Sequence, residues 1–380
     1  MAYHTPIYLF LFLPLAILCY AICPKKHRWK VLLLFSYLFF YSVSRKLLVY
    51  LLGATVLTHY IGIWLETLQT ECKGRIKSLE RGEKKEVKAQ YIRKERGVLF
   101  CGIAAMIGVL WYLKYFNFSA AVVDQFCQQH GIGFYIQPRA ILVPLGVSFY
   151  TLQSLGYMID VYRGTIPAEK NIGKLGLFLG FFPQIMEGPI CRYGETAAAL
   201  YAGEQINREN LLFGIQRIIW GMFKKIVIAD RLNTLVAAVY GVSEDFGGIV
   251  VIAAAVSYTI QLYMEFSGAI DIVIGSAQIF GVQMPENFRQ PFFSRNASEF
   301  WRRWHISLGR WFRDYVYIPL GGSRGGDLLT VRNMLIVWAL TGIWHGASWN
   351  YILWGLYFFV FLVLERFVLK KVLERLPRAV

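Results

Sequence analysis

One histidine lies in a long apolar stretch, where an ionisable side chain is costly. Residues 333–364 contain no Asp, Glu, Lys or Arg, and His345 lies within them. An ionisable group at membrane depth is disfavoured, so a functional role is the first hypothesis. A neutral imidazole in apolar surroundings can accept a proton from a reacting group, which is general-base chemistry. A structural hydrogen bond to a neighbouring helix is the alternative.

The stretch around His345 is too long for one simple membrane span and short for two full ones. We therefore expect a break near residues 348–350. Irregular backbone at membrane depth is tolerated where it lines a cavity inside the protein. Gly342 and Gly346 are small enough to let a substrate or a helix approach closely. The residues on the helical face of His345, three or four positions away, are Thr341, Gly342, Ser348 and Trp349.

A second histidine lies in the sequence FWRRWHISLGRWFRD at 300–314, which predicts a basic amphipathic helix at the membrane surface. His305 falls at the edge between its two faces, and alone it is interpreted as a structural interfacial histidine, with a functional role as the alternative. The apolar arc holds Phe300, Trp301, Trp304, Leu308, Trp311 and Phe312, and the opposite arc holds Arg302, Arg303, Arg310 and Arg313.

Three carboxylates also lie in apolar stretches, namely Glu187, Glu265 and Asp271. A buried carboxylate needs a partner of opposite charge, and Lys224 and Lys225 lie in the apolar run 211–230. Buried pairs that join helices and a role toward a substrate are both open.

Several familiar catalytic patterns are absent from the sequence. It has no GxxxxGK[ST] loop, no GxSxG elbow and no HExxH pair. The sequence GGSRGG at 321–326 is interpreted as a flexible loop, with contact to a cofactor phosphate as the alternative. The six cysteines form no CxxC pair, so we expect free thiols rather than metal ligands or disulfides.

The elements that would position these residues are membrane helices. The chain has 380 residues, 56% of them hydrophobic, and a mean hydropathy of +0.43. One soluble core cannot bury that much apolar surface, which predicts an all-α polytopic membrane protein with about ten or eleven membrane-embedded segments in a single domain, 1–380. The apolar runs are 6–22, 31–43, 47–68, 98–116, 140–161, 175–190, 211–230, 249–264, 266–282, 333–349 and 351–368.

The net charge of +16 fits a membrane protein better than a nucleic-acid-binding one, because much of it lies between apolar runs. The basic loop 69–97 and the stretch 25–30 are predicted to be cytoplasmic, which places the N-terminus outside the cell membrane. Residues 7–19 are read as the first membrane helix rather than a cleaved signal. The Arg-rich stretch 286–327 is predicted to be cytoplasmic or interfacial, before the membrane segments at 333–368.

Two motifs resemble those of the membrane-bound O-acyltransferase (MBOAT) family. They are FWRRWHISLGRWFRDYVYIPLGGSR at 300–324 and LTGIWHGASWNYILWG at 340–355. VPLGVSFYTLQSLGYMIDVYRG at 143–164, FFPQIMEGPICR at 181–192 and QLYMEFSGAIDIVIG at 261–275 also fit. The likeness covers residues 7–368 and is greatest to the bacterial branch that contains alginate O-acetyltransferase.

The resemblance implies a ring of helices around a central pore or funnel in a bacterial cell membrane. It implies that His345 is the catalytic histidine and that His305 is the second histidine of the site. The donor would be a cytoplasmic thioester, acetyl-coenzyme A or another acyl thioester, and no bound cofactor or metal is expected. A separate extracytoplasmic SGNH-hydrolase-like protein is the expected partner, with a polysaccharide as acceptor.

In this chemistry, His345 would remove the proton from an attacking hydroxyl as general base. His305 would steady the donor thioester or orient the acceptor. The donor side is assigned to Arg302, Arg303, Trp304 and Arg313, whose guanidinium groups could attract the phosphates of coenzyme A.

The sequence departs from the alginate pattern at 265–271, where EFSGAID stands in place of DFSGYSD. Members of that branch also usually carry further membrane segments beyond the position of Val380. Alginate, cellulose, peptidoglycan, another exopolysaccharide and a serine of a partner all stay open as acceptors. D-alanyl transfer to teichoic acid, a transporter of an acylated intermediate and a non-catalytic scaffold are the competing functions.

Overall fold

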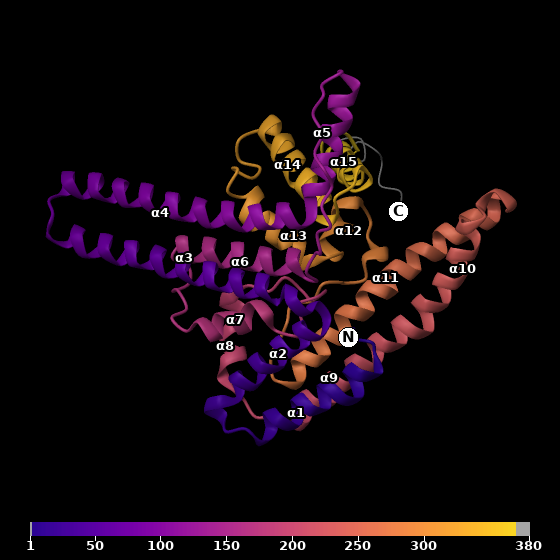
Figure 1. Ribbon diagram of the computed structural model, residues 1–380, viewed down its shortest axis with the longest axis horizontal. Coiled ribbons are helices and arrows are strands. Elements are labelled where there is room, and N and C mark those ends of the chain that lie inside the picture. Colours follow the sequence, from indigo (N-terminus) through magenta and orange to yellow (C-terminus); the bar gives the residue numbers. More distant parts are fainter. Residues whose placement is uncertain (1, 370–380) are drawn as a thin grey trace, which may run out of the picture. The chain divides into compact units, whose positions relative to one another are not determined.

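The computed structural model describes residues 2–369, most of which lie in helices joined by irregular segments (Figure 1). Within those residues, the single extended pairing is a bridge between Phe288 and Trp304. This confirms the predicted all-α class. Residues 370–380, which the sequence assigned to the same membrane domain, lie outside the described residues.

The helices form two compact units, each built from two separate stretches of chain. Unit 1 comprises Met1–His59 and Glu169–Asn287, and unit 2 comprises Tyr60–Ala168 and Phe288–Val380. Both histidines of interest, His305 and His345, belong to unit 2. The single membrane domain over residues 1–380 stays a prediction.

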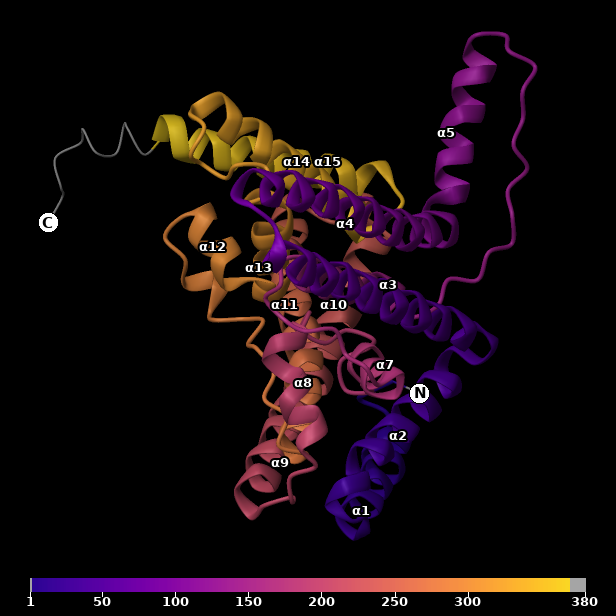
Figure 2. The ribbon, with the colours of Figure 1, turned by 90° about the vertical axis from the view of Figure 1, so that its left-hand side faces the viewer.

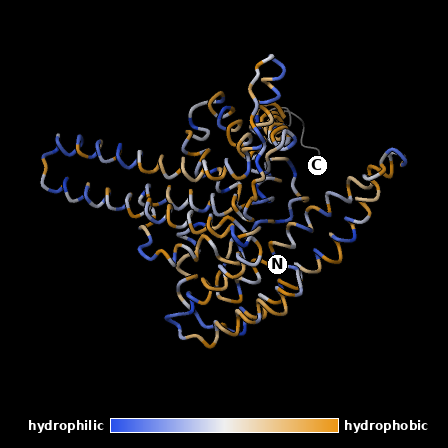
Figure 3. The backbone as a smooth tube through the Cα atoms, viewed as in Figure 1, coloured by the Kyte–Doolittle hydropathy of each residue, from blue (hydrophilic) through white to orange (hydrophobic). Residues whose placement is uncertain are grey.

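Four helical stretches among the described residues are long and apolar enough to cross a membrane. Figure 3 shows hydrophobic residues recurring along the helices in orange. A shorter apolar helical stretch runs over Tyr8–Ile22. The predicted ten or eleven segments include shorter helices as well, and that number stays a prediction. The four long stretches are Lys25–Ser78, Arg81–Gln129, Gly248–Ile279 and Trp349–Leu369.

Unit 1 consists of short helices and one long one. Asn171 and Asn207 cap α7 and α9 with their side-chain oxygens, which explains where these helices begin. The sequence predicted two segments, 249–264 and 266–282, but the chain forms one continuous helix here, α11. No proline or other helix breaker separates the two runs. The α-helices of this unit are α1 (Leu13–Ile22), α2 (Arg28–Ser44), α7 (Ile172–Gly180), α8 (Tyr193–Ala202), α9 (Arg208–Met222), α10 (Asp230–Gly241) and α11 (Gly248–Ile279).

Glycines set the close packing of α9 against α11, which lie side by side in Figures 1 and 2. A Cβ on Gly221 would lie 2.5 Å from the carbonyl oxygen of Gly268, and one on Gly275 would lie 2.6 Å from that of Gly214. Small residues at such crossings let membrane helices approach backbone to backbone.

Unit 2 contains the two motifs with histidines. Its helix α3 begins in unit 1 and continues into unit 2. The α-helices are α3 (Leu48–Arg75), α4 (Arg81–Leu110), α5 (Phe116–Gln129), α6 (Val147–Tyr162), α12 (Ala297–Arg303), α13 (Ile306–Phe312), α14 (Asp327–His345) and α15 (Trp349–Leu364).

The prediction of a basic loop at 69–97 was wrong, because most of these residues are helical. Helix α3 continues to Arg75 and α4 begins at Arg81, so only a short turn separates two charged helix ends. Lysine and glutamate are good helix formers when solvated, and a reciprocal capping box between Glu80 and Glu83 starts α4. Charge indicated exposure correctly but did not indicate loss of the helix.

Two other predicted segments are shorter as helices than their apolar runs. The run 140–161 becomes helical only at Val147, after Gly146 adopts a positive φ of 74°. The run 175–190 is helical only up to Gly180. In both places the apolar residues outside the helix lie in irregular backbone.

Helices α14 and α15 form a tight hairpin, in which residues 346–348 separate His345 at the end of the first arm from Trp349 at the start of the second. A Cβ on Gly342 would lie 2.5 Å from the carbonyl oxygen of Tyr351 and 3.2 Å from Cα of Ile352. Both of these neighbours are backbone atoms, so a side chain at position 342 could not be accommodated by the movement of a flexible side chain. The predicted role of Gly342 in a close approach is therefore confirmed for a helix.

Gly342→Ala is expected to lower the free energy of unfolding by about 1–3 kcal/mol, because the new methyl group overpacks the hairpin. Gly108→Ala on α4 is the matched control, since no atom lies within 4 Å of its Cβ position. Thermal unfolding of the two variants in detergent, followed by near-ultraviolet circular dichroism, checks this. Equal unfolding temperatures for both variants would contradict the tight packing.

Candidate functional site

A cavity of about 610 Å³ lies in unit 2 between the α12–α13 segment and the α14–α15 hairpin. His305 and His345 both line it, so residues 40 positions apart in the sequence meet at one space. Its walls combine aromatic and aliphatic side chains with guanidinium groups. The lining includes Trp301, Trp304, Leu308, Val337, Trp338, Thr341, Arg302, Arg310, Arg313 and Arg366.

His345 is the last residue of α14. The helix ends there because Gly346 is extended, with φ −176° and ψ 161°, and Ser348 then caps the start of α15. The predicted break is therefore confirmed. The imidazole packs edge-on against Trp354 at 4.9 Å between ring centroids. Packing of this kind fixes the ring orientation while leaving it on the cavity wall.

The other residues predicted on the face of His345 have separate positions. Thr341 lines the same cavity. Gly342 faces the backbone of α15. Ser348 and Trp349 belong to the start of α15 and are not among the lining residues of this cavity.

His305 lies at a break between two short helices, which corrects the predicted continuous helix at 300–314. Helix α12 ends at Arg303, Trp304 is extended, and α13 begins at Ile306. The bridge of Trp304 to Phe288, with their rings 5.0 Å apart, outweighs the local preference for a helix. A long-range pairing of this kind leaves no trace in the helical period.

The backbone of His305 has a positive φ of 46°, which is uncommon for a residue with a side chain. This conformation costs about 1–3 kcal/mol and occurs often at functional sites. The carbonyl of His305 accepts a hydrogen bond from the amide of Gly309, and this bond closes the first turn of α13. The strained turn directs the imidazole into the cavity wall, where only 4% of the residue is exposed.

Trp344 lies against both histidines. Its ring centroid is 5.8 Å from that of His305 and 5.1 Å from that of His345. Burial lowers the pKa of His305 to about 3, and His345 acts in the same direction. His305 lies outside the four long apolar stretches. It is therefore a neutral imidazole at physiological pH.

The predicted donor-side residues are divided by the structure. Arg302, Trp304 and Arg313 line the cavity. Arg303 is not among the lining residues, and it pairs with Glu299 at 2.6 Å. Two further arginines, Arg310 and Arg366, line the cavity as well.

Arg310 was on the predicted basic arc, so its type and position were signals that went unused. Arg366 follows the apolar run of α15 and gave no local signal, because its place at the cavity depends on the hairpin. The glycine-rich segment 321–326 contributes Ser323 to the same wall. The side-chain amide of Asn333 donates to the carbonyl of Gly322 at 2.9 Å and fixes this loop.

Residues 174–372 match the membrane-bound O-acyltransferase family. The chain belongs to this family. It is 34% identical over 371 residues to a probable alginate O-acetylase AlgI of Azotobacter vinelandii, covering 96% of this chain and 69% of that protein. The predicted family is thus confirmed, and the chain spans about two thirds of the length of these relatives.

Other relatives of this MBOAT protein carry different printed activities. A peptidoglycan O-acetyltransferase of Helicobacter pylori is 30% identical over 93% of this chain and 68% of its own length. A teichoic acid D-alanyltransferase of Bacillus subtilis is 29% identical over 71% of this chain and 69% of its own length. The chain is accordingly a multi-pass membrane acyltransferase, which favours an enzyme over the transporter and scaffold hypotheses.

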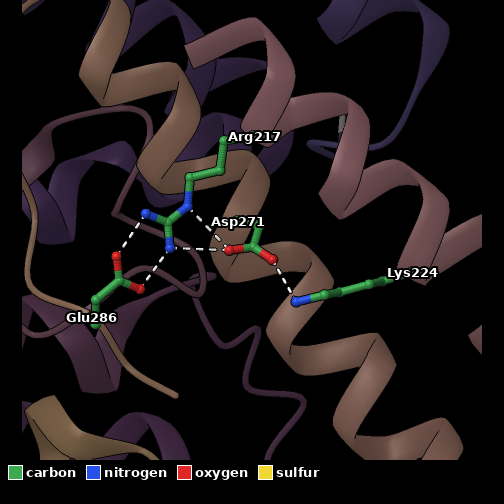
Figure 4. Close-up of polar contacts among 4 residues, drawn as sticks. All are labelled: Arg217, Lys224, Asp271 and Glu286. Atoms are coloured by element: carbon green, nitrogen blue, oxygen red, sulfur yellow. Dashed lines mark hydrogen bonds and ion pairs between the residues drawn. The ribbon is translucent and has the colours of Figure 1, made fainter. Parts of the chain in front are cut away.

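Two of the three carboxylates predicted at membrane depth, Asp271 and Glu265, form ion pairs in unit 1. Asp271 on α11 accepts from Lys224 at 2.6 Å and from Arg217 at 3.1 Å, and Glu286 binds both terminal nitrogens of Arg217 (Figure 4). Three of the four side chains come from α9, the π-helical segment η6 (Phe223–Ala229) and α11, which pack together. The predicted pairing with lysines is confirmed for Asp271 with Lys224 and for Glu265 with Lys225.

The remaining pair follows the same pattern. Lys225 donates to both carboxylate oxygens of Glu265, at 2.6 and 2.7 Å, and to Asp230 at 2.9 Å. Glu187 shares a small cavity of about 60 Å³ with Lys225 and Glu265. No group of His, Cys, Asp and Glu in residues 2–369 has the arrangement of a metal site.

Proposed function

We propose that this MBOAT protein transfers an acetyl group from a cytoplasmic thioester, such as acetyl-coenzyme A, to a hydroxyl on an extracytoplasmic polysaccharide or on a partner protein. The observation that carries the proposal is the shared cavity: two histidines and four arginines line one space. The histidines suit proton transfer, and the arginines suit a phosphate-bearing donor.

In the proposed reaction, His345 accepts the proton of the acceptor hydroxyl as its oxygen attacks the thioester carbon. His305 steadies the thioester carbonyl with its imidazole N–H. The tetrahedral intermediate then loses its C–S bond, and His345 returns the proton to the leaving thiolate. A positioned base contributes about 10²–10⁴-fold to such a step.

The lining of the cavity favours an acetyl group over a D-alanyl group. A D-alanyl thioester carries an ammonium group, which four arginines repel. In the part of the chain that the structure describes, the lining residues of this cavity include no Asp or Glu to receive an ammonium. We therefore place D-alanyl transfer second, on the strength of the relative from Bacillus subtilis.

The proposed partner is an extracytoplasmic SGNH-hydrolase-like protein that completes transfer to the polysaccharide. The N-terminus lies outside the cell in this proposal, and the charged ends of α3 and α4 lie in the cytoplasm. Mass spectrometry of surface glycans from wild-type and deletion strains names the acceptor. Loss of O-acetyl groups in the deletion strain supports the proposal, and unchanged O-acetylation contradicts it.

Donor recognition predicts a difference between two neighbouring arginines. Arg302→Ala is expected to raise the KM for acetyl-coenzyme A about 10-fold, because one charge-assisted contact to phosphate is lost. Arg303→Ala is the matched control, since Arg303 pairs with Glu299 instead of lining the cavity. Steady-state kinetics on purified protein checks both variants.

The same variants should not differ with acetyl-pantetheine, which has the thioester but no phosphate. An equal rise in KM for Arg302→Ala with both donors contradicts a phosphate contact. Equal KM values for Arg302→Ala and Arg303→Ala with acetyl-coenzyme A contradict it as well.

A further inference from the structure

Two neighbouring side chains from outside the hairpin hold the end of α14. Lys114 and Tyr115 belong to the π-helical turn η5, Trp111–Tyr115, between α4 and α5. The Lys114 ammonium donates to the carbonyl oxygen of Trp344 at 2.6 Å. The Tyr115 hydroxyl donates to the carbonyl oxygen of Ile343 at 2.7 Å. These two carbonyls directly precede His345 in the chain.

The last carbonyls of a helix have no partner inside it and need donors from elsewhere. Here α14 ends at His345, and Gly346 continues in an extended conformation. Lys114 and Tyr115 supply donors to two of these carbonyls. A cation at this end also interacts favourably with the helix dipole.

The lysine is held in place from several sides. Its ammonium also donates to the hydroxyl of Ser148 on α6 at 3.2 Å. It lies 5.9 Å from the centre of the Trp344 ring and 5.5 Å from that of Tyr115. A lysine in a long apolar helical stretch is costly, so its presence there calls for a function.

We propose that Lys114 and Tyr115 are positioning residues for His345: they fix the end of α14 and so hold the imidazole in the place that a general base requires. This inference rests on the proposed function, because it gives His345 the role of base. Neither residue lines the cavity that holds the two histidines, so both act through His345.

The positive charge of Lys114 also disfavours protonation of His345, and it acts together with the other groups around that imidazole. His305 faces it from the α12–α13 segment, and Tyr351 and Trp354 face it from α15. The four arginines that line the cavity stay charged at all working pH values. Removing Lys114 takes away one nearby positive charge, so a proton bound to the imidazole is repelled less.

Lys114→Gln is expected to lower kcat about 10-fold and to move the acidic limb of the pH profile of kcat to higher pH. The KM for the thioester donor should change less than two-fold, since Lys114 does not line the cavity. Lys114→Arg should keep the position of the acidic limb. Tyr115→Phe should lower kcat about three-fold without moving that limb. Lys88→Gln on α4 is the matched control, because its side chain is exposed.

A second measurement separates this inference from the proposed function. Histidine-selective NMR in nanodiscs follows the titration of the His345 imidazole, assigned with His345→Ala. The inference predicts that the imidazole protonates at higher pH in Lys114→Gln than in wild type. An unchanged titration and an unchanged kcat profile overturn it. Full activity of His345→Ala instead overturns the proposed base, whatever the lysine does.

The roles of Lys114 and Tyr115 can be tested even if Lys114→Gln does not fold. If Lys114→Gln does not elute as a folded protein in detergent, Lys114→Arg and Tyr115→Phe carry the test. Wild-type kcat in Tyr115→Phe, together with a shifted acidic limb in Lys114→Arg, would overturn the assigned roles.

Discussion

Replacing His345 by alanine is expected to lower kcat for acyl transfer by about 10²–10⁴-fold, the usual contribution of a general base. The protein should stay folded and inserted, because the ring lies at the end of α14 on a cavity wall and the fold does not depend on it. Transfer of radiolabelled acetyl groups to the acceptor, measured with purified protein in liposomes, gives the rate.

His130→Ala is the matched control for this variant. His130 follows α5, is exposed, and bonds only its own helix end through the carbonyl of Phe126 at 2.9 Å. Wild-type kcat is expected for His130→Ala. Wild-type kcat in His345→Ala would remove His345 from the role of base.

Asp271→Ala is expected to lower the free energy of unfolding by about 3 kcal/mol, because it leaves a buried ammonium without its partner. The Lys224 side chain is only 12% exposed and that of Asp271 is 11% exposed. Arg217 keeps its contacts to Glu286, so the cost arises mainly at Lys224. Thermal unfolding in detergent, read by tryptophan fluorescence, checks the loss.

Two comparisons sharpen this prediction. Asp230→Ala is the control, because its side chain is 48% exposed and its partner Lys225 retains Glu265, so the loss should stay below about 1 kcal/mol. Asp271→Asn keeps the shape and removes only the charge, and it should fall between the two. Equal unfolding temperatures for Asp271→Ala and Asp230→Ala would show that the buried pair does not stabilise unit 1.

The sequence predicted the features that depend on local chemistry. The uncharged stretch 333–364, with Gly346 and Ser348 inside it, indicated both the histidine and the helix break beside it. The pairing of buried carboxylates with Lys224 and Lys225 followed from the cost of burying a charge, whereas the choice of Asp271 as the partner of Lys224 came from the structure. In each case, a few neighbouring residues carry the physical cause.

Features that depend on distant contacts were not predictable in this way. The helix at 300–314 breaks at His305 because Trp304 pairs with Phe288, and the helical period contains no sign of this. The loop at 69–97 proved helical because hydropathy reports solvation and not backbone conformation. A lone lysine in the run 98–116 was a visible signal for Lys114, but its contact with the carbonyl of Trp344 joins residues 230 positions apart.

We propose that the acyl donor reacts in the cavity shared by His305 and His345. Electron cryo-microscopy of the protein with a non-hydrolysable thioether analogue of acetyl-coenzyme A tests this most directly. We expect the thioether sulfur to lie between the two imidazoles, with the phosphates toward Arg302 and Arg313. Donor density in the apolar cavity lined by Leu152 and Ile343, with none beside His345, would contradict it.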